Sequence, residues 1–144
     1  MTQIRPAQAQ PTRAQPTRAQ PATILVADDE QDIRELVAYR LSRAGYTIIE
    51  ARDGEEAFDL AAGQPPDMAV LDVMMPRLNG FDLTERLRHT PATQRLPILL
   101  MSASVQEVDI SRGFAAGADG YLTKPFTPDQ LLTRVRDVLS RGAA

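Results

Sequence analysis

The stretch that most suggests chemistry is residues 68–76, where a short apolar run ends on a single carboxylate. Met68-Ala69-Val70-Leu71 is followed by Asp72, and Pro76 comes soon after. An unbroken apolar run of this length, bounded by proline, is typical of a strand covered on both faces of a sheet. In open parallel α/β sheets ligands bind at the carboxyl ends of the strands. Asp72 is therefore the first candidate for a functional residue.

Other polar side chains follow apolar runs in the same way. Asp28 and Asp29 follow the first run, Ser102 follows the fourth and Lys124 follows the fifth. Of the 16 basic residues, Lys124 is the only lysine. An isolated lysine among arginines suggests a position that requires a compact ammonium group rather than a planar guanidinium.

The elements that must position these residues alternate between apolar strands and amphipathic helices. No hairpin signal interrupts the alternation, so right-handed crossovers and a single-domain, parallel, doubly wound α/β sheet are expected, a (βα)5 fold of the flavodoxin-like type. All five carboxyl ends then share one edge. The expected strands are 24–27, 47–50, 68–72, 97–102 and 120–122, and the expected helices are about 33–44, 54–62, 81–89, 104–116 and 128–139.

Local signals predict where some of these helices begin and end. Gly45 is expected to cap the end of the first helix, and Asn79-Gly80 to form a turn before the third. Ser104 and Glu107 match a capping box that would open the fourth helix at Ser104.

Residues 1–21 repeat the pattern Ala-Gln-Pro-Thr-Arg and are predicted to form a disordered tail, which leaves 22–144 as the folded domain. Removing the three tail arginines from the 16 basic residues leaves 13 against 19 acidic residues, a net charge of −6. An acidic body argues against direct binding of nucleic acid.

Composition excludes several other classes of site. The chain has no cysteine and one histidine, His89, so thiolate chemistry, disulfides and histidine-based metal sites are not expected. No apolar run is long enough to cross a membrane, and a cytoplasmic protein is expected.

Three carboxylates at one edge of a sheet repel one another unless a cation lies between them. Oxygen ligands without imidazole or thiolate suit Mg²⁺. Mg²⁺ beside a lysine and a hydroxyl is typical of a phosphoryl-binding site. No GxxxxGK[ST] motif is present, so nucleotide binding through that motif is not expected. Asp72 itself could accept the phosphoryl group, because carboxylates form aspartyl phosphates.

Each residue also has a plain structural interpretation. Asp28 or Asp29 could cap the first helix, Ser102 could be a turn hydroxyl, Lys124 a solvated charge and Tyr121 an ordinary strand aromatic. Because all of these residues are expected at the same edge of the sheet, a functional site is favoured over five separate structural roles.

Residues 23 to about 141 resemble the receiver domain of bacterial two-component response regulators, and the stand-alone, chemotaxis-regulator-like type in particular. The resemblance rests on Ile24-Leu25-Val26-Ala27-Asp28-Asp29-Glu30, on Leu71-Asp72-Val73-Met74-Met75-Pro76 with Asn79-Gly80, on Leu100-Met101-Ser102-Ala103, and on Gly117-Ala118-Asp119-Gly120-Tyr121-Leu122-Thr123-Lys124-Pro125-Phe126.

The resemblance implies that Asp72 is the phosphoryl acceptor. It also implies that Asp28 and Asp29 hold Mg²⁺ together with Asp72, and that the backbone carbonyl of Met74 is a further ligand.

The same resemblance implies that the Lys124 ammonium contacts the phosphoryl oxygens. It also implies a cis peptide bond between Lys124 and Pro125, which would direct the lysine side chain inward. Ser102 would be the switch hydroxyl, drawn toward the new phosphoryl group, and Tyr121 the switch aromatic, which rotates into the vacated space. The surface of the fourth helix, fifth strand and fifth helix would carry the signal.

The expected partners are a sensor histidine kinase or phosphotransfer protein, and a downstream protein target. A small phosphodonor such as acetyl phosphate could replace the kinase, and a homodimer that forms on phosphorylation is left open. The protein would assist its own phosphorylation without being an enzyme in the usual sense. Met74, two residues past Asp72, carries a thioether that orients water poorly, which predicts slow self-dephosphorylation.

Three alternatives remain at this point. A haloacid dehalogenase-type phosphatase needs a second acid two residues after the nucleophile, where this chain has Met74. A module that binds partners without phosphorylation is disfavoured by the complete set of polar residues. The receiver half of a DNA-binding regulator would require a longer chain, because no recognition helix follows Arg141.

Overall fold

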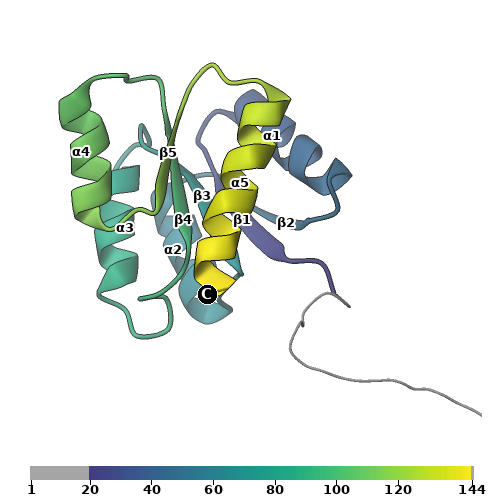
Figure 1. Cartoon of the computed structure of the whole chain (residues 1–144). Coiled ribbons are helices and arrows are strands. Elements are labelled where there is room, and N and C mark those ends of the chain that lie inside the picture. The colour runs from purple at the N-terminus through teal and green to yellow at the C-terminus, as the bar shows by residue number, and fades with distance from the viewer. Residues whose placement is uncertain (1–19, 144) are drawn as a thin grey trace, which may run out of the picture.

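The computed structural model describes residues 20–143, so nearly all of the predicted tail lies outside the described residues. Five strands alternate with five helices along the chain (Figure 1). The strands are β1 Thr23–Ala27, β2 Thr47–Ala51, β3 Met68–Asp72, β4 Ile98–Ser102 and β5 Gly120–Thr123. The helices are α1 Gln31–Arg43, α2 Gly54–Gly63, α3 Gly80–Arg88, α4 Glu107–Ala116 and α5 Pro128–Ala143.

The strands form one parallel sheet in the order β2-β1-β3-β4-β5. This confirms the predicted doubly wound (βα)5 fold. β3 and β4 lie inside the sheet and are buried along their whole length, as their unbroken apolar runs predict. β2 and β5 are the edge strands. The strand order reverses at β1 and β3, so the crevice beside the ends of these two strands is the expected place for a ligand.

The helices cover both faces of the sheet, and each face has its own apolar core. On one face α1 and α5 pack against the sheet through residues such as Leu41 and Leu131. On the other face α2, α3 and α4 do so through residues such as Ala57 and Leu87. Figure 1 shows α5 crossing one face of the sheet, with α3 and α4 on the far side from it. The two cores hold the strands rigidly, which fixes the positions of the strand ends.

Of the predictions for the helix ends, the structure confirms one and revises the others. Gly45 adopts φ +104° just after α1, as predicted for a residue that ends a helix. Asn79-Gly80 is not a separate turn, because Asn79 caps α3 by accepting a hydrogen bond from the Asp82 amide.

The predicted capping box at Ser104 is wrong. α4 begins at Glu107, and its N-cap Gln106 makes no side-chain capping bond. The Ser104 hydroxyl instead accepts a hydrogen bond from the Gln106 amide and donates one to Asp109. Residues 104–106 are therefore non-helical, where the first turn of the helix was expected.

Within residues 20–143, no helix is both long enough and apolar enough to cross a membrane.

Candidate functional site

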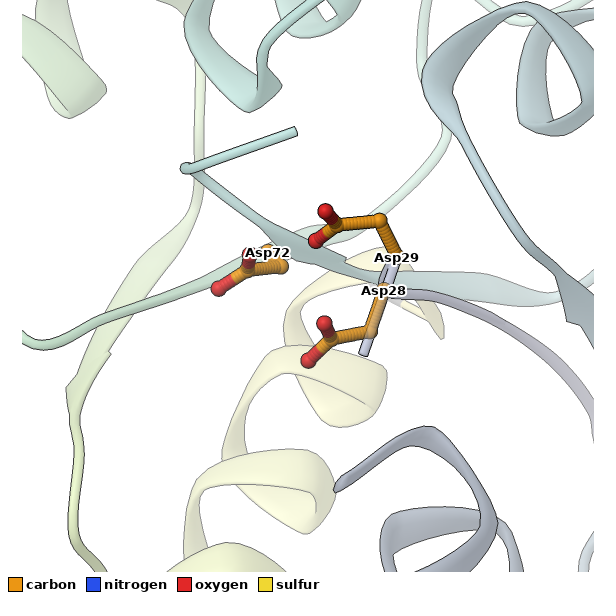
Figure 2. Close-up of side chains that lie close together, drawn as sticks. All are labelled: Asp28, Asp29 and Asp72. Carbon is orange, nitrogen blue, oxygen red and sulfur yellow. The ribbon is translucent and has the colours of Figure 1, made fainter. Parts of the chain in front are cut away.

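Two neighbouring strands carry the acidic residues to the same point. In the register of β1 and β3, Ala27 lies opposite Leu71, so Asp28 and Asp72 are next to each other at the carboxyl edge. Figure 2 shows the side chains of Asp28, Asp29 and Asp72 gathered at this edge. Carboxylate oxygens of the three residues lie within 4.8 Å of one another. The acidic cluster predicted from the sequence is therefore formed in space.

Lys124 reaches the cluster from the end of β5. Its Nζ lies 2.8 Å from Asp72 Oδ1 and 3.1 Å from Asp28 Oδ2. The peptide bond between Lys124 and Pro125 is cis, as the resemblance implied. Burial lowers the pKa of Lys124, but its contacts with Asp72 and Asp28 outweigh that effect, so the pKa is raised. The ammonium is charged at every physiological pH.

Asp72 is buried and lies in a region of excess negative charge. Its side chain is 4 % exposed, and this burial is the main reason why its pKa rises to about 6. The hydrogen bond from Lys124 lowers the pKa, whereas Asp28 and Asp29 raise it further. One ammonium for three carboxylates is too little positive charge, which leaves room for another cation at this edge.

Asp28 is fixed on two sides. Its Oδ1 accepts a hydrogen bond of 3.0 Å from the Glu30 amide, and its carbonyl accepts one of 3.0 Å from Arg34. Arg34 is buried and pairs with Glu50 at 3.0 Å. Neither Asp28 nor Asp29 caps α1, whose N-cap is Glu30.

Arg34 was missed in the sequence. The sequence does carry a signal for it, because Arg34 lies on the same helical face as the apolar residues Val37 and Leu41. An arginine on an apolar face indicates a buried cation that has an acidic partner elsewhere in the fold.

The donor set fits Mg²⁺. Asp29 is exposed, whereas Asp28 and Asp72 are buried, so the cluster combines two fixed oxygens with one at the solvent side. Mg²⁺ prefers such oxygen ligands and retains several waters. Among the described residues, no hydrogen bond reaches the carbonyl of Met74, which leaves that oxygen available as a ligand. Met74, two residues after Asp72 in the chain, is 72 % exposed.

Gly80 explains how α3 comes so close to the acceptor. A Cβ at this position would lie 2.6 Å from the Asp72 carbonyl oxygen and 2.9 Å from the Cα of Val73. The Gly80 amide donates a hydrogen bond of 2.9 Å to the Val73 carbonyl. Only glycine fits this close approach, so Gly80 supports the backbone directly behind Asp72.

In the described part of the chain, neither Ser102 nor Tyr121 makes a hydrogen bond to the acidic cluster, and both instead contact Ser104. The Ser102 hydroxyl is buried at the end of β4 and accepts a hydrogen bond of 3.1 Å from the Ser104 amide. Tyr121 is 5 % exposed, and its hydroxyl donates to the Ser104 carbonyl at 3.2 Å. Tyr121 already lies inside in this structure, so the rotation expected from the sequence is not needed to bury it.

The fold and the edge cluster together define a class: doubly wound α/β proteins with an acidic, lysine-containing site at the carboxyl edge of the sheet. The family model described as the response regulator receiver domain matches residues 24–136. The chain belongs to this family.

Curated relatives support the assignment. The chain is 46 % identical over 121 residues to the alkaline phosphatase synthesis transcriptional regulatory protein PhoP of Bacillus subtilis, covering 83 % of this chain and 49 % of the relative. It is 40 % identical over 119 residues to the phosphate regulon transcriptional regulatory protein PhoB of Pseudomonas aeruginosa, covering 83 % and 52 %. The chain therefore spans about half the length of these relatives.

Solved structures agree. The chemotaxis response regulator CheY4 of Vibrio cholerae matches with a TM-score of 0.78 and 35 % identity, over 82 % of this chain and 98 % of that one. The receiver domain of a sensor histidine kinase from Pseudomonas aeruginosa, with magnesium coordinated in its active site cleft, matches with a TM-score of 0.78 and 26 % identity, over 83 % and 98 %.

Proposed function

We propose that this receiver domain accepts a phosphoryl group on Asp72 from a histidine kinase or a phosphotransfer protein. The observation that carries the proposal is the position of Asp72, which is buried, surrounded by excess negative charge and held at 2.8 Å by the only lysine of the chain. A carboxylate fixed in this way presents its second oxygen to an incoming phosphorus atom.

In the proposed step, an oxygen of the ionised Asp72 carboxylate attacks the phosphorus atom of a phosphohistidine in line with the bond to nitrogen. A P–O bond forms, the P–N bond breaks, and its electron pair returns to the imidazole of the donor. With a pKa of about 6, Asp72 is mostly ionised at neutral pH. Lys124 moves no proton, and its ammonium stabilises the equatorial phosphoryl oxygens through charge.

A divalent ion fits the same proposal. When bound by Asp28, Asp29, Asp72 and the Met74 carbonyl, Mg²⁺ would neutralise charge on the carboxylates and on the transferred group. Asp28 is already oriented for this role by Glu30 and by Arg34. The protein assists its own phosphorylation, and we do not assign it a classical enzyme activity.

The proposed output is a change at the surface formed by α4, β5 and α5. The new phosphoryl oxygens accept a hydrogen bond from Ser102, and the shift of this residue alters the loop before α4. A downstream protein, or a second copy of the chain that associates on phosphorylation, would read the altered surface. The exchange is proposed to take place in the cytoplasm, without direct contact to nucleic acid through this domain.

A second candidate is the receiver half of a longer DNA-binding regulator. It is favoured by the names of the relatives, which are transcriptional regulatory proteins, and by the fact that this chain matches about half of their length. The two candidates share the chemistry at Asp72 and differ only in what receives the signal.

Intact-mass spectrometry tests the proposal. The protein is incubated with acetyl phosphate and Mg²⁺, and the experiment is repeated with EDTA and with the Asp72→Asn variant. We expect one phosphoryl adduct that requires Mg²⁺ and is absent from the variant. If the parent takes no adduct from acetyl phosphate or from a panel of histidine kinases, a module that binds partners without phosphorylation becomes the better account.

A further inference from the structure

Four hydrogen bonds converge on Ser104, the residue that the capping-box signal had placed at the start of α4. Its amide donates to the Ser102 hydroxyl at 3.1 Å, and its carbonyl accepts from the Tyr121 hydroxyl at 3.2 Å. Its own hydroxyl accepts from the Gln106 amide at 3.2 Å and donates to Asp109 Oδ2 at 2.6 Å. Ser104 thus uses its amide, its carbonyl and its hydroxyl at once.

These bonds connect three parts of the molecule. Ser102 lies at the end of β4, Tyr121 on β5, and Asp109 in the first turn of α4. The bond between Ser104 and Asp109 has the short length typical of a hydroxyl that donates to a carboxylate, the stronger kind of hydrogen bond. An acidic side chain in the first turn of a helix is also stabilised by the helix dipole, so the charged form of Asp109 is favoured as the acceptor for Ser104.

The Ser102 hydroxyl can still donate a hydrogen bond. It accepts from the Ser104 amide, and among the described residues no acceptor takes its proton. A phosphoryl oxygen on Asp72 would supply that acceptor. If Ser102 moves toward it, the Ser104 amide is pulled along, and the other two contacts of Ser104 carry the displacement to Tyr121 and to α4.

We propose that Ser104 and Asp109 are positioning residues that hold the Ser102 hydroxyl and join it to the first turn of α4, so that phosphoryl transfer to Asp72 displaces this helix. The inference rests on the proposed function and adds to it the specific side chains that connect the acceptor to the signalling surface. Neither residue touches the acidic cluster, so neither is a catalytic residue.

Four variants separate this role from general loosening of the loop. Ser104→Ala removes the hydroxyl but leaves the backbone contacts, and Asp109→Ala removes its acceptor. Ser104→Thr keeps the hydroxyl and is expected to behave like the parent. Glu107→Ala is the matched control, because Glu107 is an exposed acid of the same turn and makes no side-chain hydrogen bond in the described part of the chain.

The readout is hydrogen–deuterium exchange of the peptide that covers residues 104–116, with and without acetyl phosphate and Mg²⁺, alongside intact mass. Without phosphodonor, we expect Ser104→Ala and Asp109→Ala to exchange about tenfold faster than the parent, the effect of losing one hydrogen bond to a charged group. With phosphodonor, both variants should gain the Asp72 adduct while the phosphorylation-dependent change in this peptide is lost.

Each outcome has a clear consequence. If Ser104→Ala and Asp109→Ala keep the phosphorylation-dependent change of the parent, the coupling role is overturned. If their exchange without phosphodonor equals that of Glu107→Ala, the contact holds nothing and the inference fails. If no protein gains an adduct from acetyl phosphate or from a panel of histidine kinases, the proposed function fails, and the coupling to Asp72 fails with it. The exchange rates without phosphodonor still decide whether the contact restrains α4.

Discussion

Two partly buried cations lie at opposite ends of the same sheet, and their charges are balanced in different ways. Lys124 at the carboxyl edge faces a cluster of carboxylates. Arg88 at the amino edge pairs with one carboxylate, Asp119, at 3.1 Å, and donates to the backbone carbonyls of Leu96 at 2.7 Å and Gly117 at 3.0 Å. Asp119 in turn accepts from the Ile98 amide at 2.9 Å.

The difference lies in what remains unpaired. Around Arg88 the donors and acceptors are matched, and burial lowers its pKa although Asp119 acts in the opposite direction. Around Lys124 the carboxylates outnumber the cation, and burial raises the pKa of Asp72 to about 6, with Asp28 and Asp29 adding to the shift. A cluster in which charges and hydrogen-bond donors are balanced stabilises the fold, whereas a cluster with excess negative charge favours binding of a cation. The two clusters therefore differ both in their charge balance and in the burial of the paired carboxylate, which is 35 % exposed in Asp119 and 4 % exposed in Asp72.

The largest expected effect is at the matched site. Arg88→Ala should lower the free energy of unfolding by about 3 kcal/mol, because it removes the ion-pair partner of Asp119 and the side-chain donor to several backbone carbonyls. Arg88→Lys should recover little of the loss, since one ammonium cannot span contacts that lie in several directions. Urea unfolding measures both. Arg95→Ala, an exposed arginine nearby, is the control, and full stability in Arg88→Lys would contradict the account.

At the site with surplus charge, removing a charge should have the opposite sign. Without metal at pH 7, Asp72→Asn should raise the free energy of unfolding by about 2 kcal/mol, or about two thirds of the roughly 3 kcal/mol that corresponds to the shift from 3.8 to about 6. The folded pKa is the higher one, so the cost of the charged carboxylate is absent below about pH 4, grows between the two pKa values and is complete above about pH 6. The gain should therefore shrink on acidification.

Urea unfolding of Asp72→Asn at several pH values checks this prediction. Asp119→Asn at the matched site serves as the comparison and should lose stability at pH 7, because Arg88 then lacks its ion pair. A loss of stability in Asp72→Asn at pH 7 would mean that the surplus charge is already neutralised within the protein.

Mg²⁺ should stabilise the folded protein at one edge only. At a concentration ten times its dissociation constant, the gain is about 1.4 kcal/mol, and EDTA should reverse it. Thermal unfolding of the parent and of Asp29→Asn, which removes the exposed ligand, measures the effect. Equal stabilisation of both proteins would place the ion elsewhere.

The smallest effect is expected at Met74, which lies two residues after Asp72 in the chain and is 72 % exposed. A thioether accepts hydrogen bonds weakly, so it orients a hydrolytic water poorly. Met74→Asn should therefore shorten the lifetime of the phosphoryl group several-fold, which corresponds to about 1 kcal/mol in the barrier. The decay of the adduct followed by mass spectrometry gives the rate. An unchanged lifetime would remove Met74 from the account of the site.

Much of this arrangement could be predicted from the sequence, because the pattern of apolar runs sets both the strands and their ends. Asp28, Asp72 and Lys124 follow such runs, and a parallel sheet brings strand ends together. Contacts that depend on side chains far apart in the chain could not be predicted. Arg88 pairs with Asp119, 31 residues away, and donates to the carbonyl of Gly117, 29 residues away, and no local spacing encodes these contacts.

The error at Ser104 has a similar origin. Its spacing to Glu107 satisfies the capping-box pattern, but the amide of Ser104 is held by Ser102 and its carbonyl by Tyr121. These contacts from two strands fix a turn where the local pattern favours a helix, and α4 starts later. Tertiary structure overrode a valid local signal at the point where the loop leaves the site.

The central claim is that Asp72 alone accepts the phosphoryl group. Borohydride reduction of the phosphorylated protein converts an aspartyl phosphate to homoserine, and peptide mass spectrometry then locates the modified position. The account predicts homoserine at position 72 and nowhere else, in amounts that follow the adduct. Homoserine at position 28 or 29, or an adduct that borohydride does not convert, would contradict it.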